Sequence, residues 1–338
     1  MSKKYSFSPV MLSDLDIREF SSFENQSVFV TPAWIRFVQQ DSRAEPVIVR
    51  ITDMDGFVGY FVGMTVTKFG VRILGSPFSG WSTCHMGILT DRQEEKCAII
   101  RQLVPFLYRH TGCLYIEICD RDISMEQAQQ EGFYAREVGT LELNLDMDDA
   151  GLMKQMKVDC RNFVRQFERR GARLEVAQPD DTFAQQYYTQ LEDVFAKQGL
   201  VPTYSLQKVR TLMSVMADSG SILCLRVLSP DDRCIATSIF LGNKQKCYFW
   251  GGASFRQDQH YRPNEYMIYT AMRYWRDRGC KMFDMVGIRD YKRKFGSHEA
   301  HYANLVFTRV PLLITARDLA AKLYYKMGAI KGKLLKRK

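Results

Sequence analysis

The sequence lacks any apolar run long enough to cross a bilayer. A membrane-spanning helix needs about 18 or more consecutive apolar residues, and the apolar runs of this 338-residue chain are far shorter. Residues 1–16 contain two lysines but no apolar stretch before Asp14, which is not the pattern of a secretory signal. Hydrophobic residues make up 46% and charged residues 25% of the chain, an ordinary composition that excludes a disordered or fibrous protein. A cytoplasmic globular protein is therefore expected.

The short motifs of metal and hydrolase sites are also missing. The nine cysteines are odd in number and scattered, with no Cys-x-x-Cys pair, whereas zinc ligands and secreted disulfide frameworks come in pairs. The five histidines form no His-x-x-x-His pattern, and no Gly-x-Ser-x-Gly elbow is present. We expect reduced core thiols and no bound metal, and neither a metalloenzyme nor a serine hydrolase.

The positive charge is concentrated at the C-terminus. The formal net charge is +9, and residues 313–338 hold eight lysines and arginines against one aspartate, so the rest of the chain is nearly neutral. At helical spacing, the same segment places apolar residues on one stripe opposite its lysines: Leu319, Leu323, Met327, Ile330 and Leu334. A basic amphipathic helix is expected over 313–338, and it either lies on an anionic membrane surface or packs on the body of the protein.

One order of secondary structure occurs twice in the sequence. Each copy has three strands in a meander, a loop, one long helix that ends before a Gly-Cys pair, and a short buried strand. The predicted fold class is α/β (α+β), with two tandem modules that each contain a mixed, mostly antiparallel sheet flanked by helices. The expected domains are 1–150, 151–312 and the C-terminal helix 313–338. The first copy comprises 46–52, 56–70, 70–81, 91–111 and 113–119, and the second comprises 221–228, 234–242, 246–254, 263–278 and 281–287.

Four segments of the second copy carry a family resemblance. They are RNFVRQFERRG (161–171), PNEYMIYTAMRYWRDRG (263–279), KMFDMVG (281–287) and DYKRKFGS (290–297). Together they resemble the basic helix, central helix, following strand and Lys…Phe-Gly signature of the Fem family of peptidoglycan-bridge aminoacyltransferases. The resemblance implies two tandem N-acyltransferase modules of the GNAT type. It also implies transfer of an acyl or aminoacyl group, with module 2 on the acyl-transfer side and module 1 on the acceptor side.

Two residues are candidates for the chemistry of transfer. The resemblance places Lys292 near the transfer centre, where the lysine of the signature stabilises the developing oxyanion, and Lys294 follows it as a weaker candidate. Asp284 is an acid on an otherwise apolar strand, so it needs a partner or a raised pKa, and it is a candidate general base. Its counterpart in the first copy is Glu117, and two acids at matched positions are also consistent with a structural role.

Further residues are candidates for binding the substrates. Gly251 and Gly252 allow close backbone approach, either for an acyl group or as a plain bulge. The loop 254–265 has no glycine to cradle a pyrophosphate, so Arg256 and Arg262 are expected to replace backbone contacts with charge.

Two other regions are expected to hold the acceptor. Trp81 and His85, in the loop 76–87, are predicted at the rim of an acceptor pocket or in an ordered surface loop. Arg161 and Arg165 share one helix face, which either binds a phosphate-bearing substrate or is a solvated surface.

These features predict an N-acyltransferase that acts on an amine of a sugar or cell-envelope (polysaccharide) precursor. No bound cofactor is expected; the acyl donor is a co-substrate, which is an acyl-CoA, an acyl carrier protein or an aminoacyl-tRNA. The missing glycine loop favours a carrier-bound donor over ordinary acetyl-CoA, and tRNA is possible but not favoured. The expected location is the cytoplasm, with an option at the inner membrane face. The alternatives are a non-catalytic ligand- or partner-binding protein on a duplicated GNAT fold, an aminoacyl-tRNA-dependent bridge transferase, and an RNA-binding protein.

Overall fold

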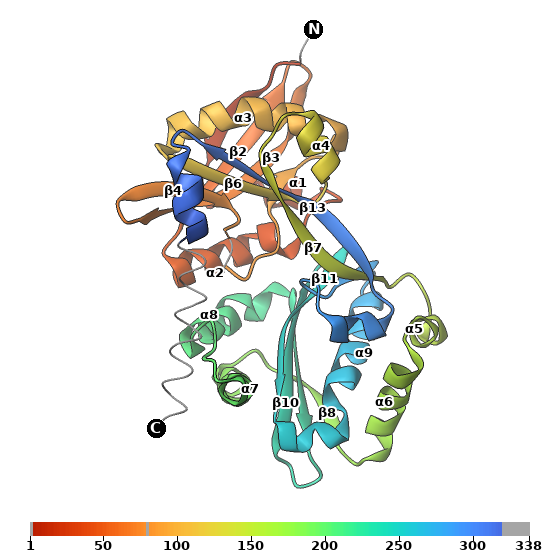
Figure 1. The fold of residues 1–338 in the computed structure, drawn as a ribbon. Helices are drawn as coiled ribbons and strands as arrows, with labels where there is room; N and C mark the ends of the chain where they lie inside the picture. The colour runs from red at the N-terminus through yellow and green to blue at the C-terminus, as the bar shows by residue number, and fades with distance from the viewer. Residues whose placement is uncertain (1–2, 79–80, 320–338) are drawn as a thin grey trace. The chain divides into compact units, whose positions relative to one another are not determined.

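The computed structural model describes residues 3–78 and 81–319. The chain forms two compact units, shown in Figure 1. Unit 1 comprises Met1–Gly139 and Ala300–Thr315, and unit 2 comprises Thr140–Glu299 and Ala316–Lys338. Within the described ranges, no helix combines the length and the apolarity needed to span a bilayer. Most of the predicted C-terminal helix lies outside the described residues, which show only its start as helical residues 312–319.

Unit 1 is a sheet with helices packed on it. Strands β1, β2, β3, β4, β6 and β13 lie side by side in that order, and short β5 pairs with β3. Only the β4–β6 pair is parallel; the other pairs recorded for these strands are antiparallel. The elements are β1 (Ser6–Val10), α1 (Ile17–Ser21), α2 (Pro32–Ser42), β2 (Glu45–Asp53), β3 (Gly56–Lys68), β4 (Val71–Ser76), β5 (Gly87–Leu89), α3 (Lys96–Thr111), β6 (Tyr115–Asp120), α4 (Met125–Gln130) and β13 (His298–Thr308).

Unit 2 repeats this plan. Its strands follow the order β7, β12, β11, β10, β9 and β8, and the β11–β12 pair is the parallel one. Its elements are β7 (Ala135–Asn144), α5 (Asp149–Gln155), α6 (Val158–Arg169), β8 (Arg173–Ala177), α7 (Asp181–Gln198), α8 (Leu206–Met216), β9 (Ile222–Leu228), β10 (Cys234–Gly242), β11 (Lys246–Ser254), the 3₁₀ helix η4 (Arg256–Tyr261), α9 (Pro263–Arg276), β12 (Met282–Asp284) and the 3₁₀ helix η5 (Asp290–Phe295). The predicted duplication is therefore confirmed in element order and in the place of the parallel strand.

Local sequence signals explain where several elements begin and end. The Thr31 side chain accepts a hydrogen bond from the Trp34 N–H at the start of α2, and Pro32 occupies the first turn. The β2–β3 turn has Gly56 at φ +119°, a backbone conformation that residues other than glycine rarely adopt. Gly112 ends α3 in the left-handed region.

The last strand of each repeat completes the sheet of the other unit. Residues 140–147 were expected in module 1, but Glu142–Asn144 of β7 pair with β12 of unit 2. Residues 301–310 were expected in module 2, but Ala303–Thr308 pair antiparallel with β6 of unit 1. Sequence alternation predicts that a segment is a strand but not which neighbour it joins, and for this reason the observed units differ from the expected boundaries at 150 and 312.

The basic stretch 150–171 contains two helices, α5 and α6. Met156 and Lys157 have extended backbone conformations (ψ 150° and 154°) and separate α5 from α6. The Lys157 N–H donates to the Lys294 carbonyl oxygen at 2.8 Å. The break thus directs a backbone donor toward η5, a contact that a continuous helix would not make.

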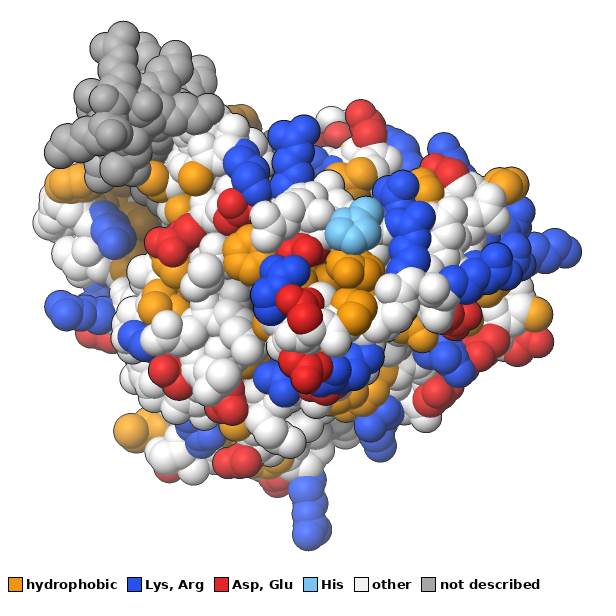
Figure 2. All heavy atoms as spheres, turned by 90° about the horizontal axis from the view of Figure 1, so that it is seen from below, with side chains coloured by type: hydrophobic (Ala, Val, Ile, Leu, Met, Phe, Trp, Pro, Cys, Tyr) orange, Lys and Arg blue, Asp and Glu red, His pale blue; other side chains and the backbone are white. Residues whose placement is uncertain are grey.

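Each unit has its own hydrophobic core. One cluster lies between the unit 1 sheet and α3, and the other lies between the unit 2 sheet and helices α6 and α9. Phe167 is buried in the unit 2 core and stacks on Tyr266 with ring centroids 4.0 Å apart. On the face shown in Figure 2, lysine and arginine side chains alternate with aspartate and glutamate. That face offers no continuous basic field for a polyanion.

Candidate active site

The two central strands of unit 2 separate along their length. β11 pairs with β12 only where Lys246–Tyr248 face Met282–Asp284. Beyond Tyr248, the register of β11 with β10 shifts: Phe249 pairs with Phe240 and Gly251 with Ile239, so Trp250 is the extra residue of a β-bulge. No strand of the described chain pairs with the other edge of residues 249–254. In the described chain, that edge of β11 therefore faces something other than a neighbouring strand.

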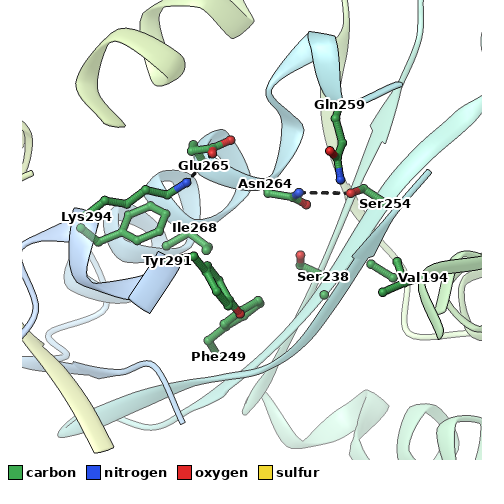
Figure 3. A pocket seen from close by; sticks show the side chains of 13 residues that line it. Val194, Ser238, Phe249, Ser254, Gln259, Asn264, Glu265, Ile268, Tyr291 and Lys294 are labelled. Carbon is green, nitrogen blue, oxygen red and sulfur yellow. Dashed lines mark hydrogen bonds and ion pairs between the residues drawn. The ribbon is translucent and has the colours of Figure 1, made fainter. Parts of the chain in front are cut away.

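A pocket of about 220 Å³ opens at this separation (Figure 3). Residues of β10, β11, η4, the first turns of α9, η5 and α7 line it. Phe249 and Tyr291 lie next to each other on one side, and Val194 and Ser238 lie on the other. The lining residues are Val194, Ser238, Phe249, Gly252, Ala253, Ser254, Gln259, Asn264, Glu265, Ile268, Tyr291, Lys294 and Phe295.

The polar groups of the pocket are concentrated at the first turn of α9. Lys294 Nζ lies 2.5 Å from Glu265 Oε1, and Asn264 Nδ2 donates to Ser254 Oγ at 3.1 Å (Figure 3). Lys294 was a weaker candidate than Lys292 in the sequence, yet it is the lysine that lines the pocket. Of the predicted binding residues, Lys294 and Gly252 are brought together here.

The start of α9 does not form a phosphate cradle. Pro263 has no N–H to offer, and the buried carboxylate of Glu265 stands in the first turn. A helix N-terminus attracts anions through its free N–H groups, and a carboxylate already placed there repels a second anion. Arg262 lies with its guanidinium 4.0 Å from the Phe163 ring centre, and Arg256 is exposed on η4. The contact of Glu265 with Lys294 and its place in the pocket could not be predicted from sequence.

The two glycines of β11 serve opposite faces of the strand. A Cβ on Gly252 would lie 2.7 Å from Ser238 Oγ and 3.0 Å from the Phe249 ring, which is the pocket side. A Cβ on Gly251 would collide with the Tyr187 hydroxyl, which donates to or accepts from Tyr204 at 2.6 Å. Both positions therefore need glycine for packing, and only Gly252 shapes the pocket.

Lys292 is buried and holds backbone. Its ammonium donates to the carbonyl oxygens of Met285 at 2.6 Å and Val286 at 2.7 Å, and the residue is 6% exposed. Val286 has φ +57°, a conformation that a β-branched residue seldom adopts. Lys292 is not among the residues that line the pocket. Its direct action on an oxyanion stays a prediction, whereas its action on the turn after β12 is visible in the structure.

Asp284 holds the same turn from the other side. Its Oδ1 accepts from the Val286 N–H at 2.7 Å and from the Thr140 hydroxyl at 2.5 Å. Thr140 Oγ1 in turn accepts from the Gly287 N–H at 3.0 Å. The structure thus brings the two predicted catalytic residues together, on residues 285–287, but Asp284 is buried and does not line the pocket either. The base role of Asp284 stays a prediction.

Burial, followed by the nearby Glu142 carboxylate, raises the pKa of Asp284 to about 6; Lys246 and the hydrogen bonds from Thr140 and Val286 oppose the shift. In the unfolded chain this pKa is near 3.8, so the folded state takes up the proton first as pH falls. The stability that this proton contributes is complete below about pH 4 and is lost as pH rises through about 6.

We expect Asp284→Asn to remove this dependence. The difference in unfolding free energy between variant and parent should rise by about 3 kcal/mol from pH 4 to pH 7, because two pKa units correspond to about that energy. Urea unfolding at several pH values measures it. In Glu142→Gln the transition should move to lower pH, because the second cause of the shift is gone; parallel pH profiles for all three proteins would contradict the assignment.

The remaining predicted residues are distributed over both units. Trp81 and His85 belong to unit 1 and are buried: the Trp81 ring packs on Phe78, and the His85 ring packs on Phe29 and Tyr302. Their rings thus contribute to packing, and their acceptor role stays a prediction. On α6 of unit 2, Arg161 donates to the Lys154 carbonyl and Arg165 is exposed.

Most residues of the pocket could not be identified from the sequence, and three of them have polar side chains near the ends of strands and helices. Asn264, Ser254 and Ser238 carry no motif of their own, although Asn264 and Ser254 lie inside or next to segments that were singled out. The available signal was position. Ser254 ends β11, Asn264 lies at the start of α9, and Ser238 lies beside the β-bulge between β10 and β11. Only the tertiary structure shows that their polar atoms converge.

Comparisons with known proteins agree with this geometry. Residues 154–293 match the family model of the acetyltransferase (GNAT) domain. The structure resembles FemX with a TM-score of 0.72 at 12% sequence identity, over 88% of this chain and 96% of that one. It also resembles the C-terminal domain of a putative lysylphosphatidylglycerol synthetase from Agrobacterium fabrum (TM-score 0.56, 12% identity, 90% and 95% covered) and a tandem GNAT protein from the clavulanic acid biosynthesis pathway (0.55, 11%, 91% and 99%). No curated protein matches the sequence significantly.

The family match covers the whole pocket of unit 2 except Lys294 and Phe295, which follow directly. The likeness to FemX and to the tandem GNAT protein extends over both units and shows the fold. The expected acyltransferase class and the expected two-module fold are thereby confirmed. Residues 154–293 thus match an acetyltransferase (GNAT) domain, within a fold similar to that of FemX.

Proposed function

We propose that the protein transfers an acyl or aminoacyl group to an amine of a sugar or cell-envelope precursor, and that the reaction takes place at the pocket of unit 2. The observation that carries the proposal is that this pocket lies where β11 and β12 separate, inside the segment that matches a GNAT domain. An open strand edge supplies fixed N–H groups to an acyl carbonyl, and the pocket encloses the acyl chain beside it.

The reaction follows from acyl-transfer chemistry. The neutral amine attacks the carbonyl carbon, a C–N bond forms, and the C–S or C–O bond to the leaving group breaks; the amine proton passes to a base and the leaving group departs as thiol or hydroxyl. The Glu265 carboxylate is the acid group that lines the pocket, and Lys294 holds it in place. We assign proton acceptance to this pair, with Asp284 and Lys292 as positioning residues for the turn after β12.

The donor is proposed to be carrier-bound. A free CoA thioester brings a diphosphate to the start of the helix after the open strand, and Glu265 stands at that place here. An acyl carrier protein or an aminoacyl-tRNA delivers its acyl group without placing a diphosphate at the start of this helix. The acceptor is assigned to module 1, with Trp81 and His85, and to the α6 face with Arg161 and Arg165. Action at the cytoplasmic membrane face through the basic tail rests on residues outside the described part.

The test begins with the protein as purified. Native mass spectrometry identifies any retained thioester, nucleotide sugar or lipid-linked precursor. Purified protein is then given acyl-CoA, acyl carrier protein and aminoacyl-tRNA in turn with amino-sugar nucleotides, and the acylated product is detected by its mass. Transfer from at least one donor is expected. A protein that binds a ligand but transfers nothing from any donor would support the non-catalytic alternative.

Donor preference gives a sharper measurement. We expect kcat/KM for acyl carrier protein to exceed that for the matching CoA thioester by about tenfold or more, because the carboxylate of Glu265 repels the CoA diphosphate. In Glu265→Gln, the KM for the CoA thioester should fall while kcat also falls, since both the repulsion and the base are removed. An unchanged KM for CoA in that variant would contradict the donor assignment without affecting the proposed reaction class.

A further inference from the structure

One end of unit 1 gathers exposed apolar side chains on adjacent segments. Phe69, at the tip of the β3–β4 hairpin, is fully exposed, and Leu312 is 73% exposed. Leu114 and Val310 are also exposed. These four residues are called the tip surface below. A single exposed apolar side chain is ordinary, but several on adjacent segments mark a candidate interaction site.

Backbone hydrogen bonds fix these segments next to one another. The Leu114 N–H donates to the Arg72 carbonyl at 2.9 Å, and the Arg309 N–H donates to the Leu114 carbonyl at 3.1 Å. Lys68 pairs with Val71 across the hairpin, so Phe69 and Gly70 form its turn. The hairpin projects from its sheet at the left of Figure 1. The tip surface is therefore a defined part of the fold.

Positive charge surrounds the tip surface. Lys68 and Arg72 flank Phe69 on the hairpin, Arg309 precedes Val310, and Arg109 lies in the last turn of α3, five residues before Leu114. The acid nearby is Glu45, which pairs with Arg72. The guanidinium of Arg309 lies 4.6 Å from the Tyr108 ring centre, which holds it at the surface. Such a surface suits an anionic bilayer, because the apolar side chains can contact the acyl chains while the basic side chains contact the phosphate groups of the lipids.

From this arrangement we infer that the tip surface docks unit 1 on an anionic lipid bilayer, with Phe69 inserted among the headgroups. A second copy of the chain is a poorer partner, because the same basic residues would face each other across a two-fold interface. The inference is independent of the proposed acyl transfer, and its test measures lipid binding alone.

The experiment uses the full-length chain and vesicles of phosphatidylcholine with about 30 mol % phosphatidylglycerol, against pure phosphatidylcholine. Phe69→Ser should lower the partition coefficient on the anionic vesicles by about fivefold or more, since burial of a phenyl ring is lost. Met54→Ser is the matched control: Met54 is almost fully exposed at the turn on the opposite end of β3, between Asp53 and Asp55. This control should change binding by less than about twofold.

A second readout reports insertion directly. Phe69→Trp should show a blue-shifted emission and quenching by brominated lipid when anionic vesicles are added, whereas Met54→Trp should show neither. Equal binding by parent and Phe69→Ser would overturn the inference and assign binding to the basic tail. Equal binding to neutral vesicles, or a dimer in solution that Phe69→Ser abolishes without any lipid binding, would overturn it as well.

Discussion

Gly252→Val is expected to lower kcat/KM for acyl transfer by about 100-fold, because its methyl groups occupy the space beside the open edge of β11. The new Cβ alone would lie 2.7 Å from Ser238 Oγ and 3.0 Å from the Phe249 ring. The donor carbonyl would then sit away from the β11 amides by the width of a methyl group. The rate is measured with the donor that the ligand and donor experiments identify.

The same substitution also strains the strand, so a second variant fills the pocket from another element. Val194 on α7 is half-buried and lines the pocket, and Val194→Trp should lower kcat/KM without a backbone clash. Val176→Trp, at an exposed position on β8, serves as the control. Full activity in Val194→Trp, together with a loss in Gly252→Val that tracks its thermal stability, would place the reaction elsewhere.

Lys292→Met is expected to reduce the free energy of unfolding by about 3 kcal/mol. The ammonium donates two charge-assisted hydrogen bonds to buried carbonyl oxygens, and bonds of this kind contribute about 1.5–3 kcal/mol each. Methionine keeps the length of the side chain and removes only the charge and the donors. Lys281→Met, at an exposed position just before β12, is the control. Urea unfolding at constant pH measures both.

A direct oxyanion role for Lys292 makes a different prediction. In that case Lys292→Met would lower kcat and leave stability near that of the parent. The positioning role predicts instead that Val286→Gly restores part of the lost stability in the Lys292→Met background, because glycine adopts φ +57° without strain. If Lys292→Met loses activity but keeps its stability, and Val286→Gly rescues nothing, the result would support a direct oxyanion role for Lys292.

The sequence predicted the repeated element order because each meander, long helix and buried strand has its own local pattern. Thr31-Pro32 and Gly112 mark helix ends through local interactions, a side-chain cap from Thr31 and a left-handed backbone at Gly112, which need no distant partner. The partners of β7 and β13 could not be predicted in this way, since a strand with alternating polarity pairs equally well with several edges.

Only part of the candidate site could be predicted, because local sequence patterns do not show tertiary contacts. The acid at position 284 was expected to need partners, because its strand is apolar, and the structure supplies them in Thr140 and Val286. The sequence favoured Lys292 over Lys294, whereas Lys294 lines the pocket. Two residues on one 3₁₀ helix point in different directions, and only the packed neighbours decide which one faces the pocket. Glu265 has no sequence signal beyond its position in a first turn.

The strand exchange has a consequence for how the gene can be divided. A fragment that ends at residue 150 keeps β7 but loses β13. One edge of β6 is then unpaired, and β7 is present without its partner β12. The complementary fragment lacks β7, the partner of β12, and carries β13 without its partner β6. Neither half therefore contains all the strands of one sheet. The two halves can be expected to recover native sheets only when they are present together.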